Sequence, residues 1–188
     1  DLLWPVDADL SQSVGEIEYA SSAIVHLAYR RNQVAHPLDA FGFVVPAIEK
    51  LRIIAGSFSS VKYAERAPDD HVLLRAFLGG ATHEGTMQLD DRAMIAAARE
   101  DMERLLGIEV EPVFTRVDRW QRSMPQYVVG HMDRVANIRR RVASLPGLDM
   151  AGNLFGGVGI PDCIADAEAA VERLLDQVDP TNVQAPPA

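Results

Sequence analysis

Four apolar runs in the first half of the chain constrain its fold most strongly. Within them, apolar residues alternate with polar ones or run unbroken, and clusters of Pro, Gly and Asp separate the runs, which is the pattern of β-strands. A fifth strand is predicted over residues 111–121. The sequence therefore predicts a sheet-rich layer that includes the runs at residues 22–30, 41–46, 51–63 and 71–81.

Helical periodicity follows these strands. Asp90 and Asp91 lie where acidic residues favour a helix start, and apolar residues then keep helical spacing up to Gly107. A further helix is predicted within residues 131–147, where a Pro-Gly pair ends it. Separate strand and helix segments of this kind predict an α+β fold, with a mixed β-sheet covered by helices.

The end of the chain is predicted to form a strand, a glycine loop and a helix. Residues 148–155, "LDMAGNLF", are expected to be a short apolar strand, and "GGVG" then supplies backbone without bulky side chains. Pro161 suits the first turn of an amphipathic helix. The free N–H groups and positive dipole end of such a helix attract an electron-rich ligand. Glycines before a helix also occur as plain structural turns, so both interpretations are open at this point.

Composition limits the partners and the chemistry. The 188 residues include 18 basic and 27 acidic side chains, and this formal charge of −9 argues against nucleic acid as a partner. The one cysteine, Cys163, excludes an intrachain disulfide and suits a reducing compartment. None of the five histidines has metal-ligand spacing, and no serine lies in a nucleophile elbow. We therefore expect no metal site and no nucleophilic hydrolysis.

Five motifs occur in order along nearly the whole chain: "FGFVVP", "GSFSSVKYAERAP", "LLRAFLGGA", "WQRSMPQYVVGH" and "GNLFGGVGIPDCI". In this order they resemble the carboxy-terminal half of the flavin-dependent protoporphyrinogen and coproporphyrinogen oxidases, which are amine-oxidase-like flavoproteins. The resemblance implies a substrate-binding domain over residues 1–121 and the carboxy-terminal part of an FAD-binding domain over residues 122–178. Residues 179–188 are expected to be a disordered tail. The dinucleotide-binding fingerprint would belong to a missing amino-terminal half, as the lack of an initiator Met also suggests.

The resemblance also implies an activity. Family members bind FAD non-covalently and oxidise a porphyrinogen to the porphyrin in three two-electron rounds, with oxygen as the acceptor and hydrogen peroxide as its product. We therefore expect FAD as the cofactor, a porphyrinogen and oxygen as partners, and a cytoplasmic enzyme of haem biosynthesis that can contact a membrane peripherally. The isolated chain would be inactive. Protoporphyrinogen and coproporphyrinogen both fit as the substrate.

The expected cofactor contacts lie in the glycine loop. Val158, Gly159 and Ile160 match the family's cofactor-contacting segment, and their N–H groups would stabilise negative charge on the reduced flavin by about 0.3 to 2 kcal/mol through the helix dipole. Gly152 and Asn153 are expected beside the ribityl or phosphate part of the cofactor. No catalytic side chain is expected, because the flavin performs the redox chemistry.

The expected substrate contacts come from the sheet. Val44, Ser57 and Phe77 match positions that hold the flat tetrapyrrole in the family, although Ser57 replaces an aliphatic residue of plant-type members. Each of these residues has the alternative of being an ordinary core residue. Trp120 has two similar interpretations: it packs against the flavin, or it belongs to the core.

Two other classes of function also fit the sequence. Another amine-oxidase-like flavoprotein, such as an amine oxidase or a carotenoid desaturase, would share the fold, although "FSSVKYAERAP" and "PQYVVGH" favour the porphyrinogen oxidases. A stand-alone binding module would keep the fold without the chemistry. The last helix departs from the family pattern, because Asp166 and Ala167 stand where a Ser-Gly pair is common. Surfaces that normally meet the absent half are expected to expose apolar area and to leave the isolated chain marginally stable.

Overall fold

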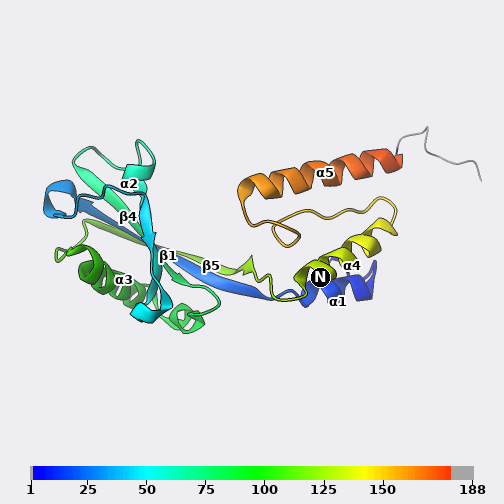
Figure 1. Ribbon diagram of the computed structural model, residues 1–188, viewed down its shortest axis with the longest axis horizontal. Coiled ribbons are helices and arrows are strands. Elements are labelled where there is room, and N and C mark those ends of the chain that lie inside the picture. The colour runs from blue at the N-terminus through cyan, green and yellow to red at the C-terminus, as the bar shows by residue number, and fades with distance from the viewer. Residues whose placement is uncertain (1, 179–188) are drawn as a thin grey trace, which may run out of the picture. The chain divides into compact units, whose positions relative to one another are not determined.

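The computed structural model describes residues 2–178, which form helices and strands from α1 to α5 (Figure 1). The strands are β1 (Tyr19–Arg30), β2 (Gly42–Val44), β3 (Ile53–Phe58), β4 (His71–Gly79) and β5 (Phe114–Pro125). The α-helices are α1 (Ala8–Gly15), α2 (Ser59–Lys62), α3 (Asp91–Leu106), α4 (His131–Ala143) and α5 (Ile160–Val178). Short 3₁₀ helices are η1 (Arg31–Gln33), η2 (Ala47–Glu49) and η3 (Glu84–Gln88).

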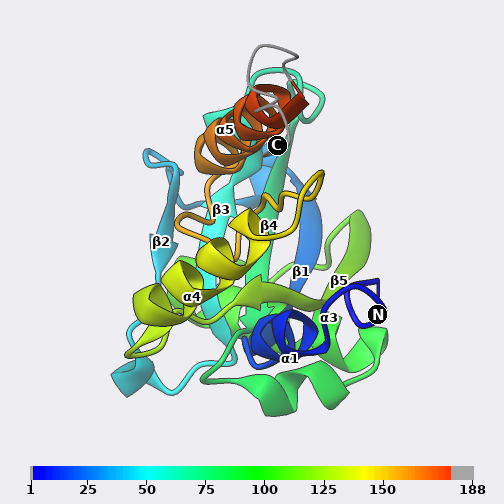
Figure 2. The same ribbon diagram turned by 90° about the vertical axis from the view of Figure 1, so that its right-hand side faces the viewer.

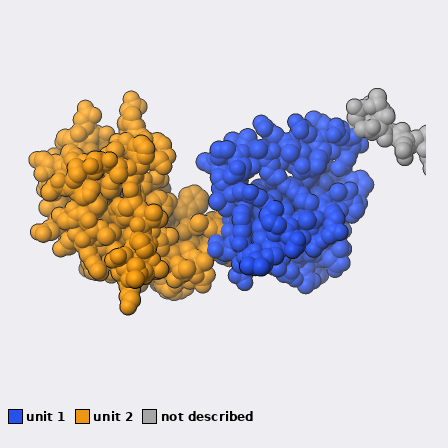
Figure 3. Space-filling view, viewed as in Figure 1, with its two compact units in different colours: residues 1–19, 125–188 blue, residues 20–124 orange. Residues whose placement is uncertain are grey.

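The chain divides into two compact units (Figure 3). Residues 20–124 contain the sheet and are called the sheet unit below. Residues 2–19 and 125–178 are called the helical unit. Residues 2–19 therefore pack with the carboxy-terminal part of the chain, whereas the motif resemblance implies that they belong to the substrate-binding domain. The predicted disordered tail, residues 179–188, lies outside the described residues.

The sheet has the strand order β2-β3-β4-β1-β5 (Figure 2). The pairs β1–β4, β2–β3 and β3–β4 are all antiparallel, so this part of the sheet is antiparallel where the sequence predicts a mixed sheet. Parallel neighbours need a long crossover, usually a helix that spans the sheet, and residues 45–52, which link β2 to β3, are too few for one. The predicted α+β class is confirmed.

Strand alternation gives the sheet a buried face and a face that is partly exposed, which we call the open face. Along β1, every second residue from Ala23 to Tyr29 is buried, and the residues between them are half-buried. The buried face packs against α3 in one apolar core. Members of this core include Val25, Leu27, Leu74, Ala76, Met94 and Met102.

Helix α3 is fixed to β3 by a buried carboxylate. Asp101 Oδ2 accepts the backbone N–H of Arg52 at 2.7 Å and that of Ile53 at 3.0 Å. At the start of the helix, the side chain of Asp90 accepts the N–H of Ala93 at 2.7 Å, which is a typical N-cap. The predicted helix before Gly107 is confirmed.

The helical unit has a smaller apolar core of its own, to which α1 and α4 contribute. At the start of α1, Asp7 accepts the N–H of Leu10 at 2.9 Å. Arg141 of α4 donates to Asp7 at 2.6 Å and to Asp9 at 2.8 Å, which ties the two helices together. The buried members of this core are Leu10, Ile17, Val135, Ile138, Val142 and Phe155.

The segment between α4 and α5 is a loop, so the predicted strand at residues 148–155 is wrong. A strand needs a paired neighbour to bind its backbone N–H and C=O groups. Within residues 2–178, no strand of the sheet pairs with this segment. Side chains bind its backbone instead.

Candidate functional site

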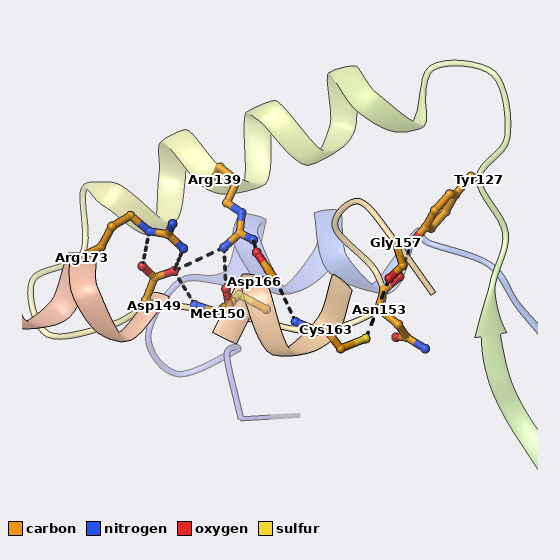
Figure 4. A network of polar contacts seen from close by, with 10 residues as sticks. Tyr127, Arg139, Asp149, Met150, Asn153, Gly157, Cys163, Asp166 and Arg173 are labelled. Carbon is orange, nitrogen blue, oxygen red and sulfur yellow. Dashed lines mark hydrogen bonds and ion pairs between the residues drawn. The ribbon is translucent and has the colours of Figure 1, made fainter. Parts of the chain in front are cut away.

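The loop of residues 148–159, called the glycine loop, is held by charged side chains (Figure 4). Asp149 is its first anchor, with a side chain only 5 % exposed. Its carboxylate accepts Arg173 Nε at 2.7 Å and the N–H of Met150 at 2.7 Å, and Arg139 Nη1 lies 3.4 Å away. The hydrogen bond from Arg173 is the main reason why the pKa of Asp149 lies below its usual 3.8. Asp149 is therefore ionised at neutral pH.

Asp166 of α5 is the second anchor of the glycine loop. Its Oδ2 accepts the N–H of Gly152 at 2.9 Å, and its Oδ1 pairs with Arg139. The guanidinium of Arg139 also donates to the carbonyl of Met150 and lies 3.7 Å from the centre of the Phe155 ring. Gly152 has a φ of +138°, which side-chain-bearing residues rarely adopt, so this turn requires glycine. Asp166 thus fixes the loop through Gly152 and Arg139.

Tyr127 and Asp162 contact the same loop from other sides. The hydroxyl of Tyr127 donates to the backbone carbonyl of Asn153, and burial raises the pKa of this tyrosine above 10.0, so the donor keeps its proton. Gly157 lies against Asp162, because a Cβ added to the glycine would be 2.5 Å from the Asp162 side chain. The path of the loop therefore depends on both a small residue and specific polar contacts.

The amino end of α5 carries exposed apolar side chains next to the first backbone N–H groups of the helix. Val158 is 61 % exposed and Ile160 is 77 % exposed. The Cys163 N–H donates to the Gly159 carbonyl at 3.0 Å, and N–H groups ahead of this bond have no acceptor within the helix. Donors at a positive helix end beside apolar surface suit a flat, electron-rich ring system such as a flavin.

The glycine loop thus brings together most of the residues predicted to bind the cofactor. Gly152 and Asn153 lie at its turn, and Val158, Gly159 and Ile160 lie where it enters α5. That these residues contact FAD stays a prediction.

The strand register aligns the predicted substrate residues on the open face of the sheet. Val44 pairs with Ala55, Ala55 with Phe77, and Phe77 with Ile24, so one row crosses four strands. Ser57 lies two residues beyond Ala55 and faces the same side. Val44 is 82 % exposed, and Ser57 and Phe77 are half-buried. None of these three residues belongs to the buried core.

A second row on the open face is polar. Arg75 pairs with Ser57 on one side and with His26 on the other. His26 Nε2 lies 3.0 Å from Asp118 Oδ2, and Arg116 Nε donates to Asp118 Oδ1 at 2.8 Å. The hydrogen bond from Arg116 is the main cause that lowers the pKa of Asp118 below 3.8, so Asp118 is also ionised at neutral pH.

Trp120 and Arg75 complete the open face. Trp120 is two residues along β5 from Asp118, so it faces the same side, and it is 54 % exposed rather than buried in the core. The guanidinium carbon of Arg75 lies 5.6 Å from the centre of the Phe77 ring. Arg75 was not among the predicted site residues, although a lone charge in the apolar run "LLRAF", two residues before Phe77, was the available signal.

Among residues 2–178, no group of three or more His, Cys, Asp or Glu side chains could hold a metal ion. No helix in the same part of the chain has the length and apolar character needed to cross a membrane.

Comparison with known families identifies the architecture. The sequence model of the family "Flavin containing amine oxidoreductase" matches residues 2–175, which include elements of both compact units. The chain belongs to this family. The segment that matches the family model includes both the open face and the glycine loop.

Curated relatives extend the family assignment. Coproporphyrinogen III oxidase of Bacillus subtilis (strain 168) is 39% identical over 82% of this chain and 33% of its own length. The coproporphyrinogen III oxidase of Propionibacterium freudenreichii is 34% identical over 93% of this chain and 33% of its own length. Mitochondrial protoporphyrinogen oxidase of Nicotiana tabacum is 26% identical over 88% of this chain and 34% of its own length. The chain thus spans about a third of the length of these relatives, and the resemblance inferred from the five motifs is confirmed.

Solved structures show the same architecture. A protein of Exiguobacterium sp. 255-15 that is designated a protoporphyrinogen oxidase matches 86% of this chain and 36% of its own, with a TM-score of 0.75 and 30% identity. Reduced UDP-galactopyranose mutase matches 97% of this chain and 37% of its own, with a TM-score of 0.63. Its identity to this chain is only 12%, so that likeness concerns the fold alone.

Proposed function

We propose that this chain is the carboxy-terminal part of an FAD-dependent porphyrinogen oxidase of haem biosynthesis. It would act with an amino-terminal region that supplies the dinucleotide-binding fingerprint. The main support is that relatives named coproporphyrinogen III oxidase match 82% and 93% of the chain at 39% and 34% identity. Identity to a relative named protoporphyrinogen oxidase is lower, at 26%, so coproporphyrinogen is the favoured substrate.

The glycine loop fits the cofactor of such an enzyme. FAD, when bound, would take up two electrons at a time from the porphyrinogen and deliver them to oxygen. The N–H groups of Val158, Gly159 and Ile160 would donate toward its electron-rich edge, and Gly152 and Asn153 would lie beside its ribityl or phosphate part. The exposed side chains of Val158 and Ile160 would exclude water from the ring system. Asp149 and Asp166 would keep the loop in place without touching the reacting atoms.

The open face fits a flat tetrapyrrole. Val44 and Phe77 lie in one row across the strands, with Val44 exposed and Phe77 half-buried. Ser57 lies on the same face, two residues along β3 from Ala55 of this row. These side chains would orient the ring through apolar contact, and Trp120 would add an aromatic surface on the same face. Oxygen as the acceptor, a cytoplasmic location and peripheral contact with a membrane are parts of the proposal that rest on the motif resemblance.

Anaerobic flavin reduction tests this proposal. The protein encoded by the complete reading frame is loaded with FAD and mixed, without oxygen, with coproporphyrinogen or protoporphyrinogen. We expect rapid bleaching of the flavin absorbance by coproporphyrinogen and the appearance of porphyrin fluorescence when oxygen is admitted. A protein that binds FAD but is reduced by neither compound would instead be another type of amine-oxidase-like flavoprotein. A protein that binds no FAD would favour a binding module.

A further inference from the structure

Arg75 differs from the other half-buried arginines of residues 2–178, because its side chain alone makes no hydrogen bond. Its Nε atom is buried and has no partner. In contrast, Arg52 donates to Asp101 at 3.2 Å, and Arg119 donates to the carbonyl of Leu89 at 2.7 Å. A charged donor that is buried without an acceptor is unfavourable by itself. An anionic ligand that binds the terminal nitrogens of the guanidinium would offset the cost of this buried charge.

The neighbours of Arg75 leave its charge available. Its two register partners on the open face, Ser57 and His26, bring no carboxylate. Asp118 shares this face, but its two oxygens are engaged by Arg116 at 2.8 Å and His26 at 3.0 Å. The guanidinium of Arg75 is therefore a positive charge with no anion bound to it among the described residues.

The surface beside Arg75 is apolar and indicates the rest of the ligand. Arg75 is two residues from Phe77 on β4, which is about 7 Å along the strand. The apolar row next to Arg75 is therefore the one that contains Val44, Ala55, Phe77 and Ile24. Arg75 itself lies over the ring of Phe77, with 5.6 Å between the guanidinium carbon and the ring centre. A complementary ligand has a flat apolar body and a carboxylate at its rim. A tetrapyrrole with propionate side chains has this form.

We propose that Arg75 binds a propionate carboxylate of the tetrapyrrole and thereby positions the ring on the open face. This inference rests on the proposed function. The planar guanidinium presents paired donors that match a carboxylate in a bidentate pair, which fixes orientation as well as adding affinity. Arg75 is a positioning and affinity residue in this role, because it takes no part in electron transfer.

Porphyrin binding to the complete FAD-loaded protein tests the inference apart from turnover. Coproporphyrin and its tetramethyl ester, which lacks ionised carboxylates, are titrated separately, and the dissociation constants are read from quenching of porphyrin fluorescence. We expect Arg75→Gln to weaken coproporphyrin binding by about 10- to 100-fold and to leave ester binding within twofold. Arg75→Lys keeps the positive charge but lacks the paired planar donors of the guanidinium. Its dissociation constant for coproporphyrin should therefore lie between those of the wild type and Arg75→Gln. The matched control is Arg92→Gln, which removes an exposed charge from α3 on the other side of the sheet.

Each outcome has a defined meaning. Equal weakening of the acid and the ester by Arg75→Gln would mean that Arg75 only shapes the surface, and unchanged binding of both would mean that it contacts no carboxylate. Either result overturns the inference while the proposed function stands. If Arg75→Gln does not fold, Arg75→Lys provides the test. Weaker binding of coproporphyrin, but not of the ester, to Arg75→Lys would support the inference, and unchanged binding of both would overturn it. A wild-type protein that neither binds coproporphyrin nor oxidises its porphyrinogen would overturn both.

Discussion

The two candidate binding regions are held in place by different forces. The open face of the sheet is backed by a continuous apolar core, in which Leu74 and Met94 are fully buried. The glycine loop has no ladder of strand hydrogen bonds and depends on Asp149, Asp166 and Arg139. Apolar burial is non-directional and tolerates changes of pH, whereas paired charges require their ionised forms. The substrate surface should therefore respond to changes of side-chain volume, and the cofactor loop to changes of charge.

The largest effect is expected from a cavity in the sheet core. Leu74→Ala removes a fully buried side chain that pairs across the sheet with Leu27, and we expect it to lower the free energy of unfolding of the sheet unit by about 3 to 4 kcal/mol. Native-state hydrogen exchange of peptides from β4 measures this loss. Leu105→Ala, at a partly exposed position on α3, is the control and should cost much less. Equal losses of unfolding free energy in the two variants would contradict the claim that burial in the core stabilises the sheet.

A slightly smaller effect is expected from removal of a loop anchor. Asp149→Ala leaves Arg173 and Arg139 without this carboxylate and frees the N–H of Met150, so we expect a local loss of about 3 kcal/mol. Hydrogen exchange should accelerate in residues 148–159 and remain unchanged in β4. The control is Asp9→Ala, whose exposed ion pair with Arg141 should contribute little. If exchange in β4 accelerated as well, the two regions would not be stabilised independently.

The smallest effect concerns pH. The pKa of Asp149 is lowered in the folded protein, mainly by the hydrogen bond from Arg173, so its stabilising contribution is complete above the ordinary value of 3.8. This contribution is lost as the pH falls from there through the lowered folded pKa. Protection of the glycine loop, corrected for intrinsic exchange, should therefore decrease below about pH 4. Asp149→Asn should remove its share of this dependence, and an identical pH profile for the variant would rule out Asp149 as the source.

The sequence predicted the elements that carry regular periodicity. All five strands overlap predicted runs, and α3, α4 and α5 follow predicted amphipathic segments. Helix α1 escaped prediction because it is short, and its stability depends on contacts such as Arg141 with Asp7, which come from distant parts of the chain. The strand expected at residues 148–155 failed for a related reason, because apolar residues alone do not provide a pairing partner.

The candidate site was predictable only where a motif marked it. Val44, Ser57 and Phe77 were named from motifs, but the register that places them on one face required the structure. Arg75 was missed because its significance lies in the lack of a partner, which no linear pattern records. Arg139 was also not predicted as a site residue, because its contacts with Asp166 of α5 and with the carbonyl of Met150 join segments that are separate in the sequence.

The row across the open face also bears on how such a surface can change over evolutionary time. Val44, Ala55, Phe77 and Ile24 each come from a different strand, and the residues on either side of Phe77 and Ile24 in the sequence belong to the core on the other side. One position can therefore mutate without altering the volume of the core. Descendants of one ancestral chain could in this way drift toward new ligands by single substitutions, while the scaffold that folds them is inherited unaltered.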